Sequence, residues 1–312
     1  MGNAGRWARR ALLLSLGAVA LFALWLGFVW PPPSWWRDHW PSKTAFMRMR
    51  ERQLEAARDT TPRRYLPVQV DSISDWLERA ATAGEDDAFF EHNGIDYHAL
   101  REALGYRRPE FSWSDARDRA ELRRALGRAR DRRDKLRGAS TITQQLAKNL
   151  YLSPSRNPLR KLKEAVIAYR LEWALSKPRI LALYLNVAEF GPNLWGAEAA
   201  SRRYFGHGAA RLSIDQAALL VATLPHPLSS NPSYRPGRTR WRQQLILRRL
   251  RGEPVEVPRE ASEDPSAAAT PADAANTATQ PDSTSRRDTL VPRNDSAAVP
   301  PKDTTATRRP TP

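Results

Sequence analysis

The clearest feature of the hydropathy pattern is an uncharged run near the N-terminus. Residues 11–30 include no charged side chain and, as a helix, would span about 30 Å, the thickness of a bilayer's hydrocarbon core. Arginines precede this run and tryptophans gather toward its far end: Arg6, Arg9 and Arg10, then Trp25, Trp30, Trp35, Trp36 and Trp40. The pattern predicts a transmembrane helix over 11–30 with residues 1–10 in the cytoplasm. A cleaved signal peptide is disfavoured, because bulky residues and prolines follow where small residues should precede cleavage.

Between residues 41 and 253, apolar positions recur at helical spacing, and the only strand-like alternation is Tyr65–Val70. This pattern predicts one all-α globular domain over 41–253. Residues 254–312 contain no Phe, Trp, Tyr, Met or Ile and are rich in Pro, Ala, Ser, Thr and Asp. Such a segment buries too little apolar surface to offset its ordering entropy, so we predict a disordered tail without chemistry.

Composition narrows the function further. The chain has 50 Lys and Arg against 34 Asp and Glu, a net charge of +16, and no cysteine. The missing cysteines exclude thiolate metal sites and a cysteine nucleophile. The positive charge favours an anionic partner, and a body outside the membrane argues against nucleic acid. Residues 107–137 form a basic insert, which fits either a solvated, ion-paired helix or a finger that faces phosphate groups.

The first stretch that suggests chemistry is 84–96, GEDDAFFEHNGID, where five carboxylates surround two adjacent aromatic residues. A carboxylate beside aromatic surface loses solvation, which suits it to general acid–base catalysis. An acidic helix start is the alternative interpretation, because Asp and Glu are favourable in a first turn.

The second stretch is 138–150, GASTITQQLAKNL. Thr141 and Gln144 fit a capping box, so a helix is expected to begin there, with Ile142, Leu146 and Leu150 as its buried stripe. Thr141, Gln145 and Lys148 fall on another face, where their donors could hold a phosphate or sugar; the alternative is a solvated polar face.

The third stretch is 156–164, RNPLRKLKE. Asn157 and Pro158 are typical of an N-cap and a first helical position. We expect one packed face on the helix that follows, made by Leu159, Leu162, Val166, Tyr169 and Trp173. Glu164 lies on another face among four cations, which suits a pyrophosphate, although a simple ion pair with Arg160 is the alternative.

Together these stretches resemble the peptidoglycan glycosyltransferases, which polymerise lipid II. The motif EDxxFxxHxG is matched by Glu85, Asp86, Phe89, His92 and Gly94, STITQQLxKN by 140–149, and RKxxE by Arg160, Lys161 and Glu164. The resemblance covers about residues 65–240 and leaves no room for a transpeptidase domain, so it points to the monofunctional, membrane-anchored branch. It implies an all-α, lysozyme-like fold with a small membrane-proximal lobe.

The resemblance also implies a reaction and its residues. The growing glycan on undecaprenyl pyrophosphate is joined to lipid II with inversion, at the outer face of the bacterial inner membrane. Glu85 would be the general base and Glu164 would assist the leaving pyrophosphate. Binding residues would be Ser140, Gln145, Lys148, Arg156, Lys161 and Lys163. No cofactor is required, Mg²⁺ or Mn²⁺ is compatible, and other cell-wall synthesis proteins are candidate partners.

Two departures from the family pattern affect this expectation. Ala182 stands where the family usually has Glu, and the insert at 107–137 lengthens the segment between the first two motifs. Two other functions are therefore considered: a lysozyme-like enzyme that cleaves glycan, and a catalytically impaired scaffold that binds lipid II. A hydrolase would not need the cations between Lys148 and Lys163, and the scaffold is supported by Ala182 alone.

Overall fold

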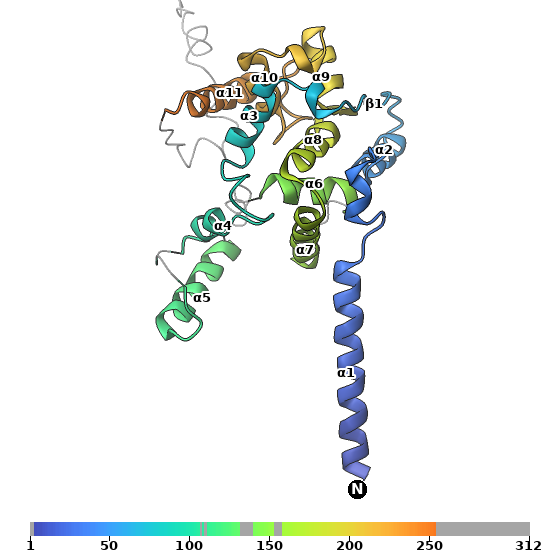
Figure 1. The fold of residues 1–312 in the computed structure, drawn as a ribbon, viewed down its shortest axis with the longest axis vertical. Helices are drawn as coiled ribbons and strands as arrows, with labels where there is room; N and C mark the ends of the chain where they lie inside the picture. The colour runs from blue at the N-terminus through green and yellow to red at the C-terminus, as the bar shows by residue number, and fades with distance from the viewer. Residues whose placement is uncertain (1–2, 107, 109–110, 132–139, 153–157, 254–312) are drawn as a thin grey trace, which may run out of the picture. The chain divides into compact units, whose positions relative to one another are not determined.

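Helices make up most of the chain, as the apolar spacing predicts. In the computed structural model, residues 3–106, 108, 111–131, 140–152 and 158–253 are described (Figure 1). Their elements, in chain order, are α1 (Asn3–Gly27), η1 (Pro33–Arg37), α2 (Ala45–Ala56), β1 (Arg64–Tyr65), η2 (Val70–Ser72), α3 (Asp75–Glu85), α4 (Tyr97–Ala103), α5 (Ala116–Asp131), α6 (Ile142–Tyr151), α7 (Pro158–Ala174), α8 (Lys177–Val187), β2 (Glu189–Gly191), β3 (Leu194–Trp195), α9 (Ala197–Phe205), η4 (Ala209–Arg211), α10 (Ile214–Thr223) and α11 (Gly237–Leu250). The tail 254–312 lies outside the described residues, so its predicted disorder is untested.

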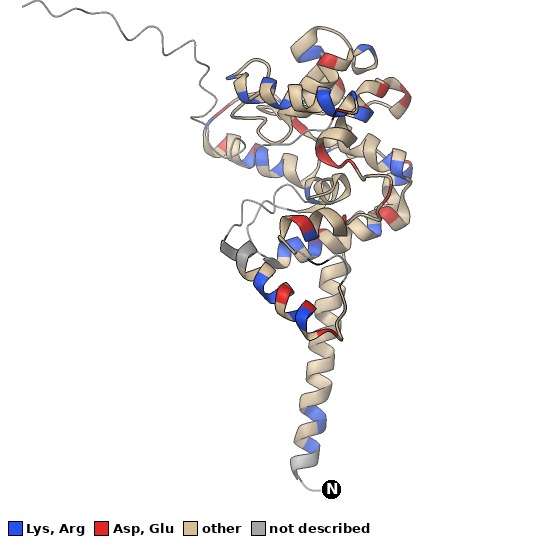
Figure 2. Ribbon diagram, turned by 90° about the vertical axis from the view of Figure 1, so that its left-hand side faces the viewer, with Lys and Arg blue, Asp and Glu red and all other residues tan. Residues whose placement is uncertain are grey.

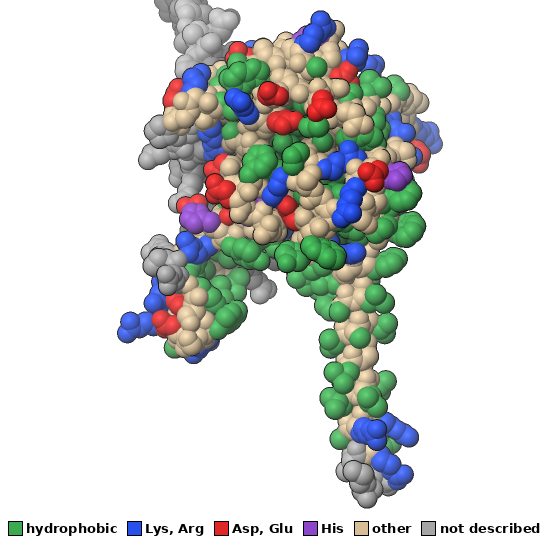
Figure 3. Space-filling view, in the orientation of Figure 1, with side chains coloured by type: hydrophobic (Ala, Val, Ile, Leu, Met, Phe, Trp, Pro, Cys, Tyr) green, Lys and Arg blue, Asp and Glu red, His purple; other side chains and the backbone are tan. Residues whose placement is uncertain are grey.

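The N-terminal apolar run forms one long helix, α1, which begins earlier and ends earlier than residues 11–30. Its part from Arg6 to Gly27 is long and apolar enough to cross a membrane. In Figure 3, hydrophobic side chains project at intervals along this helix, and basic side chains lie near its N-terminal end. The helix ends at Gly27, and Pro31, which disfavours helical backbone in Trp30, limits how far it could continue.

The strand content is small and local. β3 pairs in parallel with β1 and antiparallel with β2, so the order in the sheet is β1-β3-β2. Of the expected strand at Tyr65–Val70, only Tyr65 lies in β1, and Val70 begins the short helix η2. Asn186 of α8 explains this: its side chain donates to Val68 O (3.0 Å) and accepts from Val68 N (2.8 Å), in place of a strand partner.

The core lies around α8, in which every residue from Ile180 to Val187 is buried. α6 packs on α7 and α8, while α10 packs on α3 and α11. The buried stripe predicted for α6 is confirmed: Ile142, Leu146 and Leu150 are buried, and Thr141 forms a capping box with Gln144. This packing brings the end of α3, the start of α6 and α7 together.

The face of α7 that we expected to be packed is instead exposed. Leu159, Leu162, Tyr169 and Trp173 are 45%, 46%, 63% and 87% exposed. The opposite face, which includes Ile167 and Leu171, is buried. The sequence offers two apolar faces on this helix, and the face with fewer aromatic residues enters the core.

The basic insert is described in part, and α5 carries charges of both signs along its length (Figure 2). Asp118 near its start is buried and accepts hydrogen bonds from Tyr106 Oη (3.0 Å) and Ser112 N (2.8 Å). Arg108 Nε also lies 2.9 Å from Asp118. The described part therefore fits an ion-paired helix, and a phosphate-facing role stays a prediction.

Candidate active site

Glu85 is the last residue of α3, and both oxygens of its carboxylate have partners. Its side chain is 8% exposed. Gln145 of α6 donates from Nε2 to Glu85 Oε2 (2.8 Å), and Gln145 Oε1 in turn accepts from Tyr184 Oη (3.0 Å). Arg242 of α11 donates from Nη2 to Glu85 Oε1 (2.8 Å). The structure thus places two predicted site residues in direct contact and adds Arg242.

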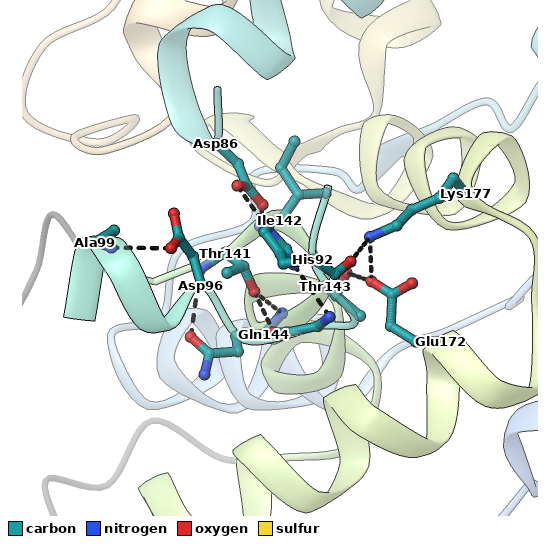
Figure 4. A network of polar contacts seen from close by, with 11 residues as sticks. Asp86, His92, Asp96, Ala99, Thr141, Ile142, Thr143, Gln144, Glu172 and Lys177 are labelled. Carbon is teal, nitrogen blue, oxygen red and sulfur yellow. Dashed lines mark hydrogen bonds and ion pairs between the residues drawn. The ribbon is translucent and has the colours of Figure 1, made fainter. Parts of the chain in front are cut away.

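The next residue, Asp86, fixes the first motif to the start of α6 (Figure 4). Its Oδ2 accepts from the backbone N of Ile142 (2.9 Å), the first residue of that helix, where a negative charge is favourable. Its Oδ1 lies 2.9 Å from His92 Nε2. Gly94 N donates to His92 Nδ1 (3.1 Å), so this geometry places the ring proton on Nε2, which donates to Asp86.

Gly94 closes the motif against the second stretch. Its φ of +89° is the left-handed conformation that a side chain disfavours, and a Cβ there would lie 3.2 Å from the backbone of Ala168. Its carbonyl accepts from Thr141 Oγ1 (2.7 Å). The glycine of the first motif is therefore hydrogen-bonded directly to the N-cap residue of α6.

A second polar cluster ties α6, α7 and α8 together (Figure 4). Thr143 Oγ1 donates to Glu172 (2.5 Å), and Lys177 Nζ donates to the same Glu172 oxygen (2.8 Å) and to His92 O (2.6 Å). Lys177 also lies 4.4 Å from the ring centre of Phe89, a cation–π contact. This cluster holds the helices that carry the predicted site residues.

Glu164 is a buried carboxylate on α7, only 3% exposed. Arg160 Nη1 donates to one of its oxygens and Lys161 Nζ to the other, both at 2.5 Å. Lys161 also donates to Ser140 Oγ (2.9 Å), which links the second and third stretches. The simple pair with Arg160 therefore exists, and a second cation joins it.

Lys148 is half-buried and interacts electrostatically with both candidate carboxylates. Burial lowers the pKa of Lys148, and the neighbouring Lys161 and Arg160 lower it further, while Glu164 and Glu85 oppose this shift. An ammonium group that has lost hydration interacts strongly with an anion that enters beside it. Lys148 is thus close enough to both candidate acids to interact with each of them electrostatically.

Lys163, one of the predicted binding residues, lies away from this cluster. Lys163 turns toward the end of α1: its Nζ donates to Trp25 O (2.8 Å) and lies 4.5 Å from the centre of the Trp25 ring. Arg170, two turns along α7, donates to Gly27 O in the same way. Arg156 lies outside the described residues, as does Asn157.

Sequence reasoning missed Arg242, Glu172 and Lys177. Arg242 follows Glu85 by 157 positions, so no spacing rule links the two residues. Ala182, which stands where the family usually has Glu, is buried within α8, with 2% of its surface exposed.

The described residues include no group of three or more His, Cys, Asp or Glu side chains that could hold a metal ion. Both oxygens of Glu85 and of Glu164 already accept from nitrogen donors.

The site as described therefore consists of two buried acids in a helical domain, each of which binds at least one cation. A sequence model described as transglycosylase matches residues 51–251. A biosynthetic peptidoglycan transglycosylase of Azoarcus sp. (strain BH72) is 42% identical over 74% of this chain and 89% of that protein. Proteins of the same name from Bordetella avium (strain 197N) and Thiobacillus denitrificans (strain ATCC 25259 / T1) are 37% and 38% identical, over 81% of this chain and 97% and 98% of theirs. The chain belongs to the transglycosylase family.

Proposed function

We propose that this chain is a membrane-anchored peptidoglycan glycosyltransferase, which polymerises lipid II into β-1,4-linked glycan. The observation that carries the proposal is that Gln145 donates a hydrogen bond to Glu85 and Lys161 donates one to Glu164. The backbone N of Ile142 also donates to Asp86, which ties the first motif to α6, the helix that carries Gln145. The names of the relatives support the same activity.

In this mechanism Glu85 is the general base. It accepts the proton of the lipid II 4-hydroxyl as that oxygen attacks C1 of the donor sugar, and the configuration at C1 inverts. Each carboxylate oxygen has a second lone-pair direction, so Glu85 can accept this proton while Gln145 and Arg242 stay bound. One base is sufficient, because an inverting transfer proceeds in a single displacement.

The bond that breaks joins C1 to the pyrophosphate oxygen, and undecaprenyl pyrophosphate leaves with the electron pair. Lys148 and Lys161 would stabilise its growing negative charge, and Ser140 would contact a phosphate oxygen. Arg156 and Lys163 belong to this proposal by their place in the family motifs. Glu164 would assist through the two cations that it binds, Arg160 and Lys161.

We also propose that α1 crosses the bacterial inner membrane once, with residues 1–10 in the cytoplasm and a catalytic domain over 41–253 on the periplasmic side. The arginines before the apolar run support this direction. The exposed apolar face of α7 supports a position against the membrane surface, because α7 also binds the end of α1 through Lys163 and Arg170. Lipid II and the growing lipid-linked glycan would reach the site from that surface.

The test is incubation of the detergent-solubilised full chain with labelled lipid II, and separately with preformed glycan strands. A glycosyltransferase makes longer glycan from lipid II and releases undecaprenyl pyrophosphate. Shortening of preformed glycan without polymer formation would identify a hydrolase instead. Binding of lipid II without any change in its length would identify a scaffold.

A further inference from the structure

Arg242 reaches the candidate base from a distant part of the chain and holds both its side chain and its backbone. Its Nη2 donates to Glu85 Oε1 (2.8 Å) and to the carbonyl of Gly84 (2.7 Å). A guanidinium is a planar, permanently charged donor, so two contacts from one nitrogen restrict the carboxylate's direction. We propose that Arg242 is a positioning residue, which fixes the Glu85 carboxylate for proton abstraction; this inference rests on the proposed function.

The cost of this arrangement supports the assignment. Arg242 Nε is buried and has no hydrogen-bond partner among the described residues. A buried donor without a partner costs about 1–3 kcal/mol, and such groups are rare in folded proteins. The guanidinium is therefore oriented by its contacts with Glu85 and Gly84 at the expense of its own hydrogen bonding.

The opposite oxygen of the carboxylate is held as well. Gln145 binds Glu85 Oε2 from α6, and Tyr184 of α8 fixes the Gln145 amide. Rotation of the carboxylate would break the bond to either Gln145 or Arg242. Its plane is thus set by residues from three helices besides its own.

Arg242 is not needed merely to fasten α11 to α3. Ile246 of α11 packs against Gly84, where an added Cβ would lie 3.0 Å from its Cδ1. Arg249, two turns further along α11, donates from Nη1 to the carbonyl of Ala83 (2.8 Å). Arg249 therefore makes the same kind of tie to the end of α3 without touching the carboxylate, which makes it a matched control.

The charged and polar groups that face Glu85 are the cations Arg242 and Lys148 and the phenol of Tyr184, with Asp86 next to it in the chain. Of the cations in the described part of the chain, Arg242 is the one that donates a hydrogen bond to the Glu85 carboxylate. Loss of a contact that only positions the carboxylate should lower kcat and leave KM nearly unchanged.

The experiment compares Arg242→Gln, Arg242→Lys and Arg249→Gln in the full detergent-solubilised chain, with lipid II as substrate. Arg242→Gln should lower kcat by about 10²-fold with little change in KM. Arg242→Lys should restore part of the rate, because it keeps the positive charge but not the planar guanidinium. Arg249→Gln should stay within about twofold of the wild type in both kcat and KM.

Equal losses of rate in Arg242→Gln and Arg249→Gln, in proportion to their melting temperatures, would show that Arg242 is only structural and would overturn the inference. A wild-type rate in Arg242→Gln would also overturn it. Failure of the proposed function is distinct, because the wild type would then make no polymer. In that case the inference would be overturned together with the proposed function, because there would be no proton abstraction for Arg242 to position.

Discussion

Asp86 offers a sharp test of how the first motif is joined to α6. Asp86→Ala removes a carboxylate that is 8% exposed and accepts from Ile142 N and His92 Nε2. A hydrogen bond to a charged group contributes about 1.5–3 kcal/mol, and the donor left in His92 would be buried without a partner. Because these losses overlap, we expect a destabilisation of about 3–5 kcal/mol.

For a domain of this size, each kcal/mol shifts the melting temperature by about 2–4 °C, so Asp86→Ala should melt about 6–20 °C lower. Asp86→Asn, which keeps one acceptor oxygen, should lose less. The control is Asp87→Ala, because Asp87 is the exposed neighbour and should change stability by about 0.5 kcal/mol at most. Thermal denaturation of the solubilised chain measures all three variants. If Asp86→Ala has the same melting temperature as Asp87→Ala, the hydrogen bonds of Asp86 to Ile142 and His92 do not contribute to stability, and the reasoning is refuted.

Three further variants test other parts of the account. Burial lowers the pKa of Lys148, so its charged form costs stability at neutral pH; Lys148→Met should raise the melting temperature there, and the gain should shrink as pH rises toward the usual lysine pKa. The same variant should polymerise lipid II at least about tenfold more slowly, and faster turnover would contradict the role of Lys148. Ala182→Glu places a carboxylate at a 2% exposed position and should cost about 2–4 kcal/mol without raising the rate; a gain in rate would contradict this. Trp173→Ser should change stability by about 0.5 kcal/mol at most, because Trp173 is 87% exposed. A loss of several kcal/mol would instead show that this face of α7 is packed, as the sequence predicted.

Local signals in the sequence predicted local structure well. The capping box at Thr141 and the start of a helix at Pro158 each depend on a few adjacent residues, and the structure has both. The long uncharged run likewise predicted α1, although the helix begins at Asn3 and ends at Gly27, because hydropathy alone does not mark where a helix begins or ends.

Features that depend on tertiary packing were not predictable in this way. Helical spacing gave α7 two apolar faces, and only its packing against α6 decided that Ile167 enters the core and Trp173 does not. Lys163 looked like a member of the cation cluster because it is adjacent to Glu164 in sequence, yet successive residues point about 100° apart on a helix. The contact between Arg242 and Glu85 depends on how α11 packs against α3, which no local pattern encodes.

The most direct test of the central claim is the rate at which Glu85→Gln polymerises labelled lipid II, measured beside its affinity for lipid II. Gln keeps the shape of Glu85 but is a far weaker proton acceptor than a carboxylate. The account predicts nearly unchanged binding and a rate reduced by at least about 10²-fold. Polymer formation by Glu85→Gln at the wild-type rate would contradict the assignment of Glu85 as the base.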